Sequence, residues 1–321
     1  MTDKDNIRGD EHTGTAGSDT TGKQCRIILN PASGTEDHAD EVHSRATERG
    51  YTVVETTEPG DAVTLAKEAA EDGVRLLAAC GGDGTIHHVI HGLDQADALD
   101  DVTVAVIPGG TGNNFAQNIG VMSIEQAFEL LDAGEKRCID LGVADTEPFM
   151  NSCIAGLTAK TSSETDSDLK ERFGTLAYAI TGLQHAADFD PLHVEIDTNE
   201  STAAGATWTG DALCILIGNA RRFPGGGQAN VEDGRFDITI VEEMPTNEML
   251  TEAAIQRFFG GETEHVTHIT SEHLEIKHQQ EKPIEFSLDG EISNHKQLSL
   301  HVRPRALEIV VGPEYTPEPT A

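Results

Sequence analysis

Residues 74–85 read VRLLAACGGDGT, an apolar run that leads directly into a glycine-rich loop. A short apolar run bounded by glycines predicts a buried strand of a parallel sheet. Glycines at the end of such a strand allow a tight turn into a following helix. The helical pattern continues from Ile86 to Leu93, so the stretch predicts a strand–loop–helix unit.

The same unit repeats along the first third of the chain. Strands are expected at residues 25–29, 51–55, 74–80 and 103–107, with helices between them that end near Arg49, Glu71 and Leu93. Gly50 and Gly73 act as helix stop signals. Alternating strands and helices imply right-handed crossovers, so we expect an α/β domain with a mostly parallel sheet.

From about Lys136 the pattern changes to many short strands. They are expected at residues 149–154, 193–196, 212–217, 236–241, 274–277, 284–288, 298–302 and 307–311, with helices near 173–187 and 246–259. This pattern predicts an all-β, sandwich-like second domain. A groove between two such domains is the usual place for a ligand.

The chain is expected to divide into four segments. Residues 1–23 are polar and aperiodic and predict a disordered acidic tail. Residues 24–135 form the expected α/β domain, residues 136–312 the expected β-rich domain, and residues 313–321 a second tail. A return of the last strand to the first domain is left open.

The chain is strongly acidic, with 22 Lys and Arg against 56 Asp and Glu and a formal net charge of −34 over 321 residues. This charge argues against nucleic-acid partners and against an electrostatic anchor on anionic lipid, because both need a basic face. The acidic residues are spread along the chain, which favours a solvated surface suited to a salt-rich, halophilic cytoplasm.

The five cysteines do not form a recognisable framework. Their number is odd, they are widely separated, and no C-x-x-C is present, which argues against disulfides and a zinc site. No window approaches 18 consecutive apolar residues, and the N-terminus lacks a signal peptide's apolar stretch. We expect a cytoplasmic protein that contacts membranes only transiently.

Three polar, glycine-rich loops follow predicted parallel strands: NPASG at 30–34, GGDGT at 81–85 and GGTGN at 109–113. Parallel strands end at one edge of the sheet, and ligands bind outside that edge. Glycines there let backbone N–H groups approach phosphate oxygens, although each loop alone is also explained by a tight turn. Neither a Walker P-loop nor a G-x-G-x-x-G follows a strand, which disfavours P-loop NTPases and standard dehydrogenases.

Asp83 lies inside the second of these loops. A carboxylate next to phosphates is repelled unless a cation or an acidic proton lies between them. Asp83 is therefore a candidate for binding Mg²⁺ or for taking a proton from an attacking hydroxyl. The alternative is a turn aspartate that caps the following helix.

Four blocks in order carry a family resemblance: Asn30-Pro31-x-Ser33-Gly34, Gly81-Gly82-Asp83-Gly84-Thr85, Gly110-Thr111-Gly112-Asn113-x-Phe115-Ala116 and Asp289-Gly290-Glu291. Weaker matches lie at residues 225–227 and 233–237. Across residues 24–312 the chain resembles the diacylglycerol kinase catalytic-domain superfamily, in particular the soluble prokaryotic lipid kinases related to sphingosine kinases. The second block alone is also similar to NAD kinases and phosphofructokinases.

The resemblance implies ATP as co-substrate, Mg²⁺, a nucleotide-binding first domain and a lipid-accepting second domain. The nucleotide would be held by Asn30, Ser33, Gly81, Gly82, Gly84, Thr85, Gly110, Thr111 and Asn113. Asp83 would act near the γ-phosphate, and Asp289 would be the general base with Glu291 beside it. Asp233 and Asp237 would hold a structural divalent cation.

The residues alone support these roles less strongly. Asp289 and Glu291 follow the apolar run 284–288, and in an extended segment they share one face. Gly290 permits a bend, so a polar hairpin turn is the alternative. For Asp233 and Asp237 the alternative is a turn followed by a strand-edge acid.

Two positions depart from the family's usual pattern. His87 and His88 stand where an acid usually follows the GGDGT loop, and Asn114 stands where Asp is frequent. Both departures replace a carboxylate near the expected phosphates, so they affect how a metal would be bound and which phosphoryl donor would be used. His87 and His91 share a helix face and can be read as metal ligands, but no carboxylate or cysteine partner is visible, so a helix-face cluster is the plainer interpretation.

We expect an ATP-dependent kinase that phosphorylates a lipid hydroxyl at the membrane surface. The acceptor would be a diacylglycerol-like, sphingoid-like or ether-glycerol lipid. The alternatives are NAD kinase-like phosphorylation of a soluble acceptor and a nucleotide-binding regulatory module without turnover.

Arg221 and Arg222 are a rare basic pair, read as surface charge or as a phosphate contact at the cleft mouth. The oligomeric state is not fixed, and a homodimer stays open.

Overall fold

The computed structural model of this chain describes residues 25–34, 38–156, 191–198, 207–223, 227–242 and 265–319. The predicted tail at 1–23, the helices expected near 173–187 and 246–259, and Gly225 and Gly226 lie outside the described residues. In the described part, no helix is both long enough and apolar enough to cross a membrane.

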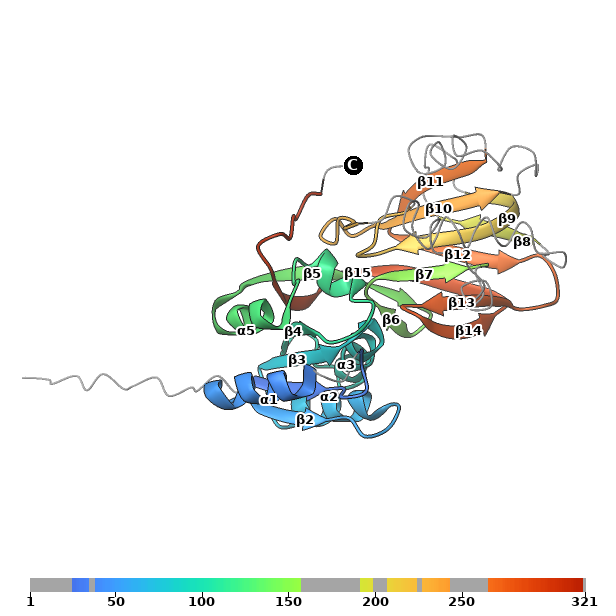
Figure 1. Ribbon diagram of the computed structural model, residues 1–321. Coiled ribbons are helices and arrows are strands. Elements are labelled where there is room, and N and C mark those ends of the chain that lie inside the picture. The colour runs from blue at the N-terminus through green and yellow to red at the C-terminus, as the bar shows by residue number, and fades with distance from the viewer. Residues whose placement is uncertain are drawn as a thin grey trace, which may run out of the picture.

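The first domain is a parallel sheet covered by helices (Figure 1). Its strands are β1 (Cys25–Leu29), β2 (Thr52–Glu55), β3 (Leu76–Gly81) and β4 (Thr103–Pro108), in the order β4-β3-β1-β2. Its helices are α1 (His38–Arg49), α2 (Asp61–Glu71), α3 (Asp83–Gln95), α4 (Asn114–Asn118) and α5 (Ile124–Ala133). The strands pair in parallel, which confirms the predicted α/β architecture.

Apolar runs became strands here because both sides of the sheet are buried. Ile27, Leu77 and Val104 are inaccessible to solvent, and most residues along the same strands are buried. Helix α5 was not anticipated, although Ser123 is a typical N-cap and its Oγ accepts a hydrogen bond from the Gln126 backbone N–H at 3.2 Å.

The second domain is built from antiparallel strands: β6 (Glu147–Phe149), β7 (Ser152–Ala155), β8 (Leu192–Asp197), β9 (Thr207–Gly218), β10 (Phe236–Glu242), β11 (Val266–Ser271), β12 (His273–His278), β13 (Ile284–Leu288) and β14 (Glu291–His295). Long strand β9 pairs with β8 along its first half and with β7 and β10 along its second. A strand shared in this way lets the sheet fold over a common core. Phe149 and Phe236 stack inside that core, with ring centroids 5.6 Å apart. The predicted sandwich-like second domain is confirmed.

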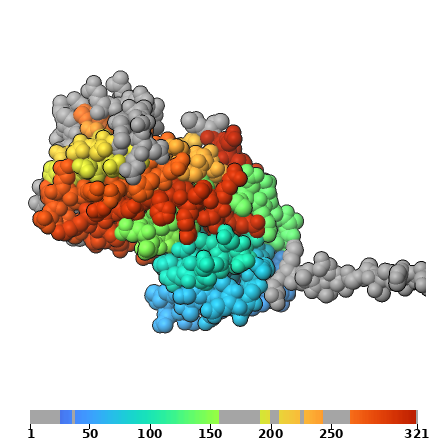
Figure 2. Space-filling model, turned by 180° about the vertical axis from the view of Figure 1, so that it is seen from behind, coloured from blue at the N-terminus to red at the C-terminus, as the bar shows by residue number. Residues whose placement is uncertain are grey.

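The last strand, β15 (Gln297–Val311), joins the two domains. Its start pairs with β12, most of its length pairs with β5 (Glu135–Ala144), and Ile309 pairs in parallel with Val104 of β4. Leu300 lies in the core of the second domain and Leu307 in that of the first. Seen from behind, the red C-terminal residues lie against the cyan residues of the first domain (Figure 2).

Two strand predictions in this region were wrong in detail. The patterns at 298–302 and 307–311 belong to the single strand β15, which is irregular between Arg303 and Leu307, where Arg305 has a φ of 52°. The pattern at 149–154 is broken between β6 and β7 at Met150 and Asn151.

Candidate active site

The three glycine-rich loops meet at the carboxyl edge of the parallel sheet, and their backbones touch. A Cβ on Gly110 would lie 2.4 Å from the Gly82 Cα. A Cβ on Gly34, whose φ is +62°, would lie 2.5 Å from the Gly109 carbonyl oxygen. Glycine is therefore required at both positions for the loops to pack together, in addition to any contact with a ligand.

Polar side chains tie the same loops to one another. Asn30 Nδ2 donates to Thr85 Oγ1 at 3.1 Å, and the Gly82 N–H donates to Ser33 Oγ at 3.4 Å. Asn113 both accepts from the Gly110 N–H and donates to its carbonyl oxygen, at 3.0 and 2.9 Å. These bonds hold the loop backbones in place before any ligand arrives.

A pocket of about 410 Å³ opens beside these loops, within the usual size range of small-ligand sites. It is lined by Asn30, Ala32, Ser33, Thr56, Thr57, Glu58, Pro59, Gly60, Ala62, Gly82, Gly84, Thr85 and His88. The residues predicted at 81, 110, 111 and 113 are not among its lining. Residues 56–60 were missed, although they follow β2 and so lie at the same sheet edge.

Asp83 caps a helix distant from it in sequence. Its carboxylate accepts hydrogen bonds from the Asn114 N–H and side-chain amide, both at 3.1 Å, and from the Phe115 N–H at 3.0 Å. It therefore holds the start of α4 rather than capping its own helix. Burial raises the pKa of this carboxyl, while the Phe115 and Asn114 donors partly offset the effect.

Asp289 and Gly290 form a two-residue hairpin turn between β13 and β14, with φ values of 49° and 106°. This backbone geometry suits an Asp-Gly pair. The expectation that Asp289 and Glu291 share one extended face was therefore wrong, and the alternative, a polar hairpin turn, is confirmed. Asp289 turns into the protein, and Glu291 begins the next strand as an exposed residue.

The Asp289 carboxylate is fully buried and fully occupied. Its oxygens accept hydrogen bonds from the backbone N–H groups of Met150, Asn151 and Ser152 at 2.7, 2.8 and 2.9 Å. His87 Nδ1 lies 3.4 Å from its Oδ2. A carboxylate has about four acceptor positions, so protein groups take up all of them. The break between β6 and β7, together with the first residue of β7, provides the three N–H groups.

Glu291 is the accessible carboxylate of the group. Its side chain is 53 % exposed, and Oε1 lies 3.8 Å from His88 Nε2. The same oxygen is 4.0 Å from where a Cβ on Gly84 would stand. Glu291 thus reaches from the second domain to the glycine-rich loop of the first.

His87 and His88 connect the domains from α3. His87 is buried, and its Nε2 lies 3.5 Å from Glu147 Oε1. Burial favours the neutral His87 ring, but the carboxylates of Asp289, Glu147 and Glu291 outweigh it and raise the pKa. For His88, burial and the neighbouring His87 lower the pKa.

Arg221 adds a cation on the side of Asp83. Burial lowers the pKa of its guanidinium, and the Asp83 carboxylate partly opposes that effect. Its Cζ lies 5.1 Å over the Phe223 ring. The arginine is therefore partly buried rather than a fully exposed surface charge, and its phosphate contact stays a prediction.

Asp233 and Asp237 lie apart from the glycine-rich loops. Asp233 Oδ1 accepts from the Arg235 N–H at 3.0 Å in a turn, and Asp237 lies in β10. Burial raises the pKa of both carboxyls. In the described part of the chain, neither belongs to a group of three or more His, Cys, Asp or Glu ligand atoms. Their cation-binding role stays a prediction.

Comparison with known proteins agrees with this geometry. Residues 24–144 match the diacylglycerol kinase catalytic domain, and residues 151–311 match the YegS C-terminal NAD kinase beta sandwich-like domain. A probable lipid kinase YegS-like of Shewanella frigidimarina is 30 % identical over 297 residues, covering 90 % of this chain and 94 % of the relative. This chain belongs to the diacylglycerol kinase catalytic-domain family.

Other members of the diacylglycerol kinase family are equally similar. The diacylglycerol kinase of Bacillus subtilis is 31 % identical over 286 residues, covering 84 % of this chain and 90 % of the relative. The crystal structure of a diacylglycerol kinase from Bacillus anthracis superposes with a TM-score of 0.71 at 23 % identity, covering 91 % and 97 % of the two chains. That superposition shows the same fold.

Proposed function

We propose that this family member is an ATP-dependent lipid kinase, which transfers the γ-phosphate of ATP to a lipid hydroxyl. The observation that carries the proposal is the approach of Glu291 to the glycine-rich loop. An accessible carboxylate of one domain thus lies beside the glycine-rich loops of the other, which would bind the phosphates. Phosphoryl transfer needs this combination of positioning and charge.

The pocket beside the loops is the proposed nucleotide site. Its volume suits a nucleotide, and Gly82, Gly84 and Thr57 are among the residues that line it. Asp83 keeps one of about four acceptor positions free after its three bonds, so it fits as a Mg²⁺ ligand. The bound ion would neutralise charge on the phosphates.

We assign proton removal from the acceptor to Glu291. A general base needs an open acceptor position within reach of the hydroxyl. Asp289 has none open in this structure, because three N–H groups and His87 surround it. Asp289 would instead fix the turn that presents Glu291. Arg221 would contact the transferred phosphate, since its guanidinium is a cation that feels the charge of Asp83.

A lipid acceptor is supported by the relatives' names and by one local feature. Several relatives are named lipid or diacylglycerol kinases. Ile292, next to Glu291 on edge strand β14, is 47 % exposed, although single exposed apolar residues are common. We propose that this edge approaches the membrane surface. Diacylglycerol-like, sphingoid-like and ether-glycerol lipids all carry a suitable hydroxyl.

The deciding experiment measures transfer of labelled γ-phosphate from ATP with Mg²⁺ in molar KCl. The acceptors are a lipid extract and, separately, NAD. We expect label in the organic phase. The Gly110→Ala variant should lose transfer, because its Cβ would strike Gly82. Gly112→Ala is the matched control, since its Cβ meets nothing closer than 3.7 Å.

Two other outcomes would reject the lipid proposal. Label on NAD alone would support a soluble acceptor, the second candidate, which the match to an NAD kinase-like sandwich domain favours. ATP binding without label on either acceptor would support a regulatory nucleotide-binding module. Equal loss in both glycine variants would show that the cradle geometry is not the cause.

A further inference from the structure

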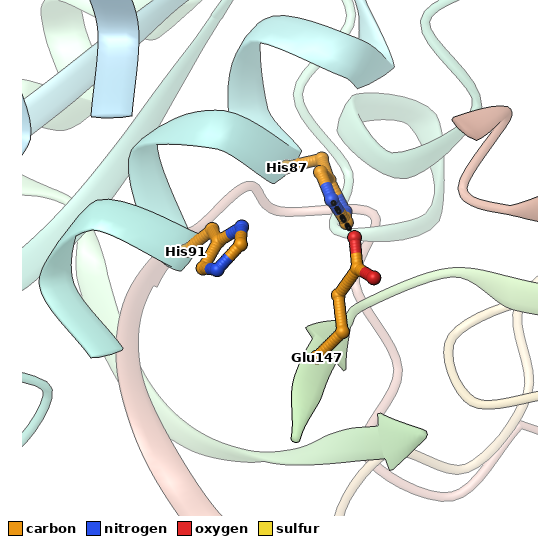
Figure 3. A group of neighbouring side chains, drawn as sticks. All are labelled: His87, His91 and Glu147. Atoms are coloured by element: carbon orange, nitrogen blue, oxygen red, sulfur yellow. Dashed lines mark ion pairs between the residues drawn. The ribbon is translucent and has the colours of Figure 1, made fainter. Parts of the chain in front are cut away.

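Three metal-ligating side chains converge where the two domains meet, outside the nucleotide pocket. His87 and His91 lie one turn apart on α3, and Glu147 begins β6 in the β5–β6 hairpin. Figure 3 shows all three pointing into the same space between the helix and the strand. One ligand atom from each lies within 4.8 Å of the other two.

The spacing suits a tetrahedral transition-metal ion. Bonds of about 2.0–2.2 Å to nitrogen and oxygen place neighbouring ligand atoms roughly 3.4 Å apart. His87 Nε2 and Glu147 Oε1 are already separated by 3.5 Å. A ring nitrogen of His91 lies within 4.8 Å of both, and the Gln95 amide, 2.8 Å from His91 Nε2, fixes the orientation of the ring.

The surroundings of His87 match those of a metal-bound histidine. Its Nε2 faces Glu147, while its Nδ1 faces the buried Asp289 carboxylate at 3.4 Å. A carboxylate on the far ring nitrogen fixes the tautomer and orientation of a histidine ligand. Three backbone N–H groups in turn hold Asp289, so this support is rigid.

We propose that His87, His91 and Glu147 bind one Zn²⁺-like divalent transition-metal ion that ties α3 to the β5–β6 hairpin. Two imidazoles select such an ion over Mg²⁺, which prefers oxygen ligands alone. Three protein ligands leave a fourth position for water. The ion lies behind Asp289 and is distinct from any Mg²⁺ on the nucleotide.

The test uses the untagged full-length chain after its metals have been removed with a chelator. Co²⁺ is titrated in, its visible ligand-field absorption is followed, and Zn²⁺ or Mg²⁺ is then added as competitor. We expect one Co²⁺ per chain, displaced by Zn²⁺ and not by excess Mg²⁺. His91→Ala and Glu147→Gln should each weaken binding by at least about tenfold, since even outer-shell changes cost that much.

His43→Ala is the matched control, because His43 also pairs with a glutamate, Glu55 at 2.6 Å, but on an exposed surface. It should leave Co²⁺ affinity unchanged. The proposal is overturned if no Co²⁺ binds, if binding survives both site variants, or if the control weakens it equally. Circular dichroism verifies that each variant is folded. Because no readout involves phosphate transfer, failure here is separate from failure of the kinase proposal.

Discussion

Asp83, Asp289 and Glu291 differ in how many acceptor positions the protein already occupies. Three donors surround the Asp83 carboxylate, and three N–H groups and His87 surround that of Asp289. Among the described residues, the ion-pair contact of Glu291 is the distant one to His88, at 3.8 Å. Three acids that look equivalent in the motifs therefore differ: the acceptor positions of Asp289 are all taken by backbone and His87, Asp83 holds backbone but keeps one position open, and Glu291 is the most open of the three.

This difference predicts opposite effects for two amide substitutions, Asp289→Asn and Glu291→Gln. Asp289→Asn places an amide against three N–H donors and should lower the free energy of unfolding by about 2–3 kcal/mol. Glu291→Gln should leave stability unchanged, because the side chain is exposed, but lower turnover by about 10²–10⁴-fold. Urea unfolding and initial rates measure the two effects. If the Asp289→Asn variant is stable but inactive while the Glu291→Gln variant is active, the general base is Asp289 and not Glu291.

At the scale of elements, α3 and β15 carry the contacts between the domains. From α3, His87 and His88 approach Asp289 and Glu291, and Asp94 pairs with Arg303 of β15 at 2.5 Å. Strand β15 contributes apolar side chains to both cores. A continuous sheet and helix α3 thus both join the domains, which limits how freely they move apart.

Glu308 of β15 makes this junction sensitive to acid. It accepts from the Thr103 hydroxyl of β4 and pairs with Lys136 of β5 at 3.1 Å. The pKa of the Glu308 carboxyl is lowered, mainly by the hydrogen bond from Thr103 and next by the one from Lys136. A lowered folded-state pKa gives stability that is present above the unfolded value, about 4.3, and is lost as pH falls through the folded value.

We therefore expect Glu308→Gln to lower Tm modestly at pH 7, since the side chain is 43 % exposed and screened. The difference from the wild type should vanish at a pH below the folded pKa, where the carboxylate is protonated. Thermal unfolding across this pH range tests it. Glu314→Gln, an exposed control, should show no pH-dependent difference. A Glu308→Gln deficit that persists in acid would contradict the assignment.

At the scale of the whole molecule, the charge of −34 dominates. Like charges spread over one surface repel, and salt shortens their range from about 10 Å at 0.1 M to about 3 Å at 1 M. Tm should therefore rise between 0.1 and 1 M KCl at pH 7. Near pH 4.5, the calculated isoelectric point, the rise should be much smaller. Equal rises at both pH values would show that salt acts through something other than charge screening.

Local patterns predicted the elements whose environment is uniform. Strands β1 and β13 and helix α2 begin and end at the expected residues, because short apolar or amphipathic runs are closed there by turn residues. The parallel-strand rule also predicted that the loops at 30–34, 81–85 and 109–113 share an edge. Strand β14 was missed, although Asp289-Gly290 is a strong hairpin signal.

The sequence by itself determined the two-domain architecture and the sheet edge where the three glycine-rich loops meet, because both follow from short-range periodicity and glycine placement. Only the tertiary structure decided that Glu147 meets His87 and that backbone N–H groups occupy the acceptor positions of the Asp289 carboxylate. It also decided that residues 297–311 form one strand that contributes to both cores. These contacts join residues tens to hundreds of positions apart. They depend on how strands pair across the sheet, which local sequence patterns do not encode.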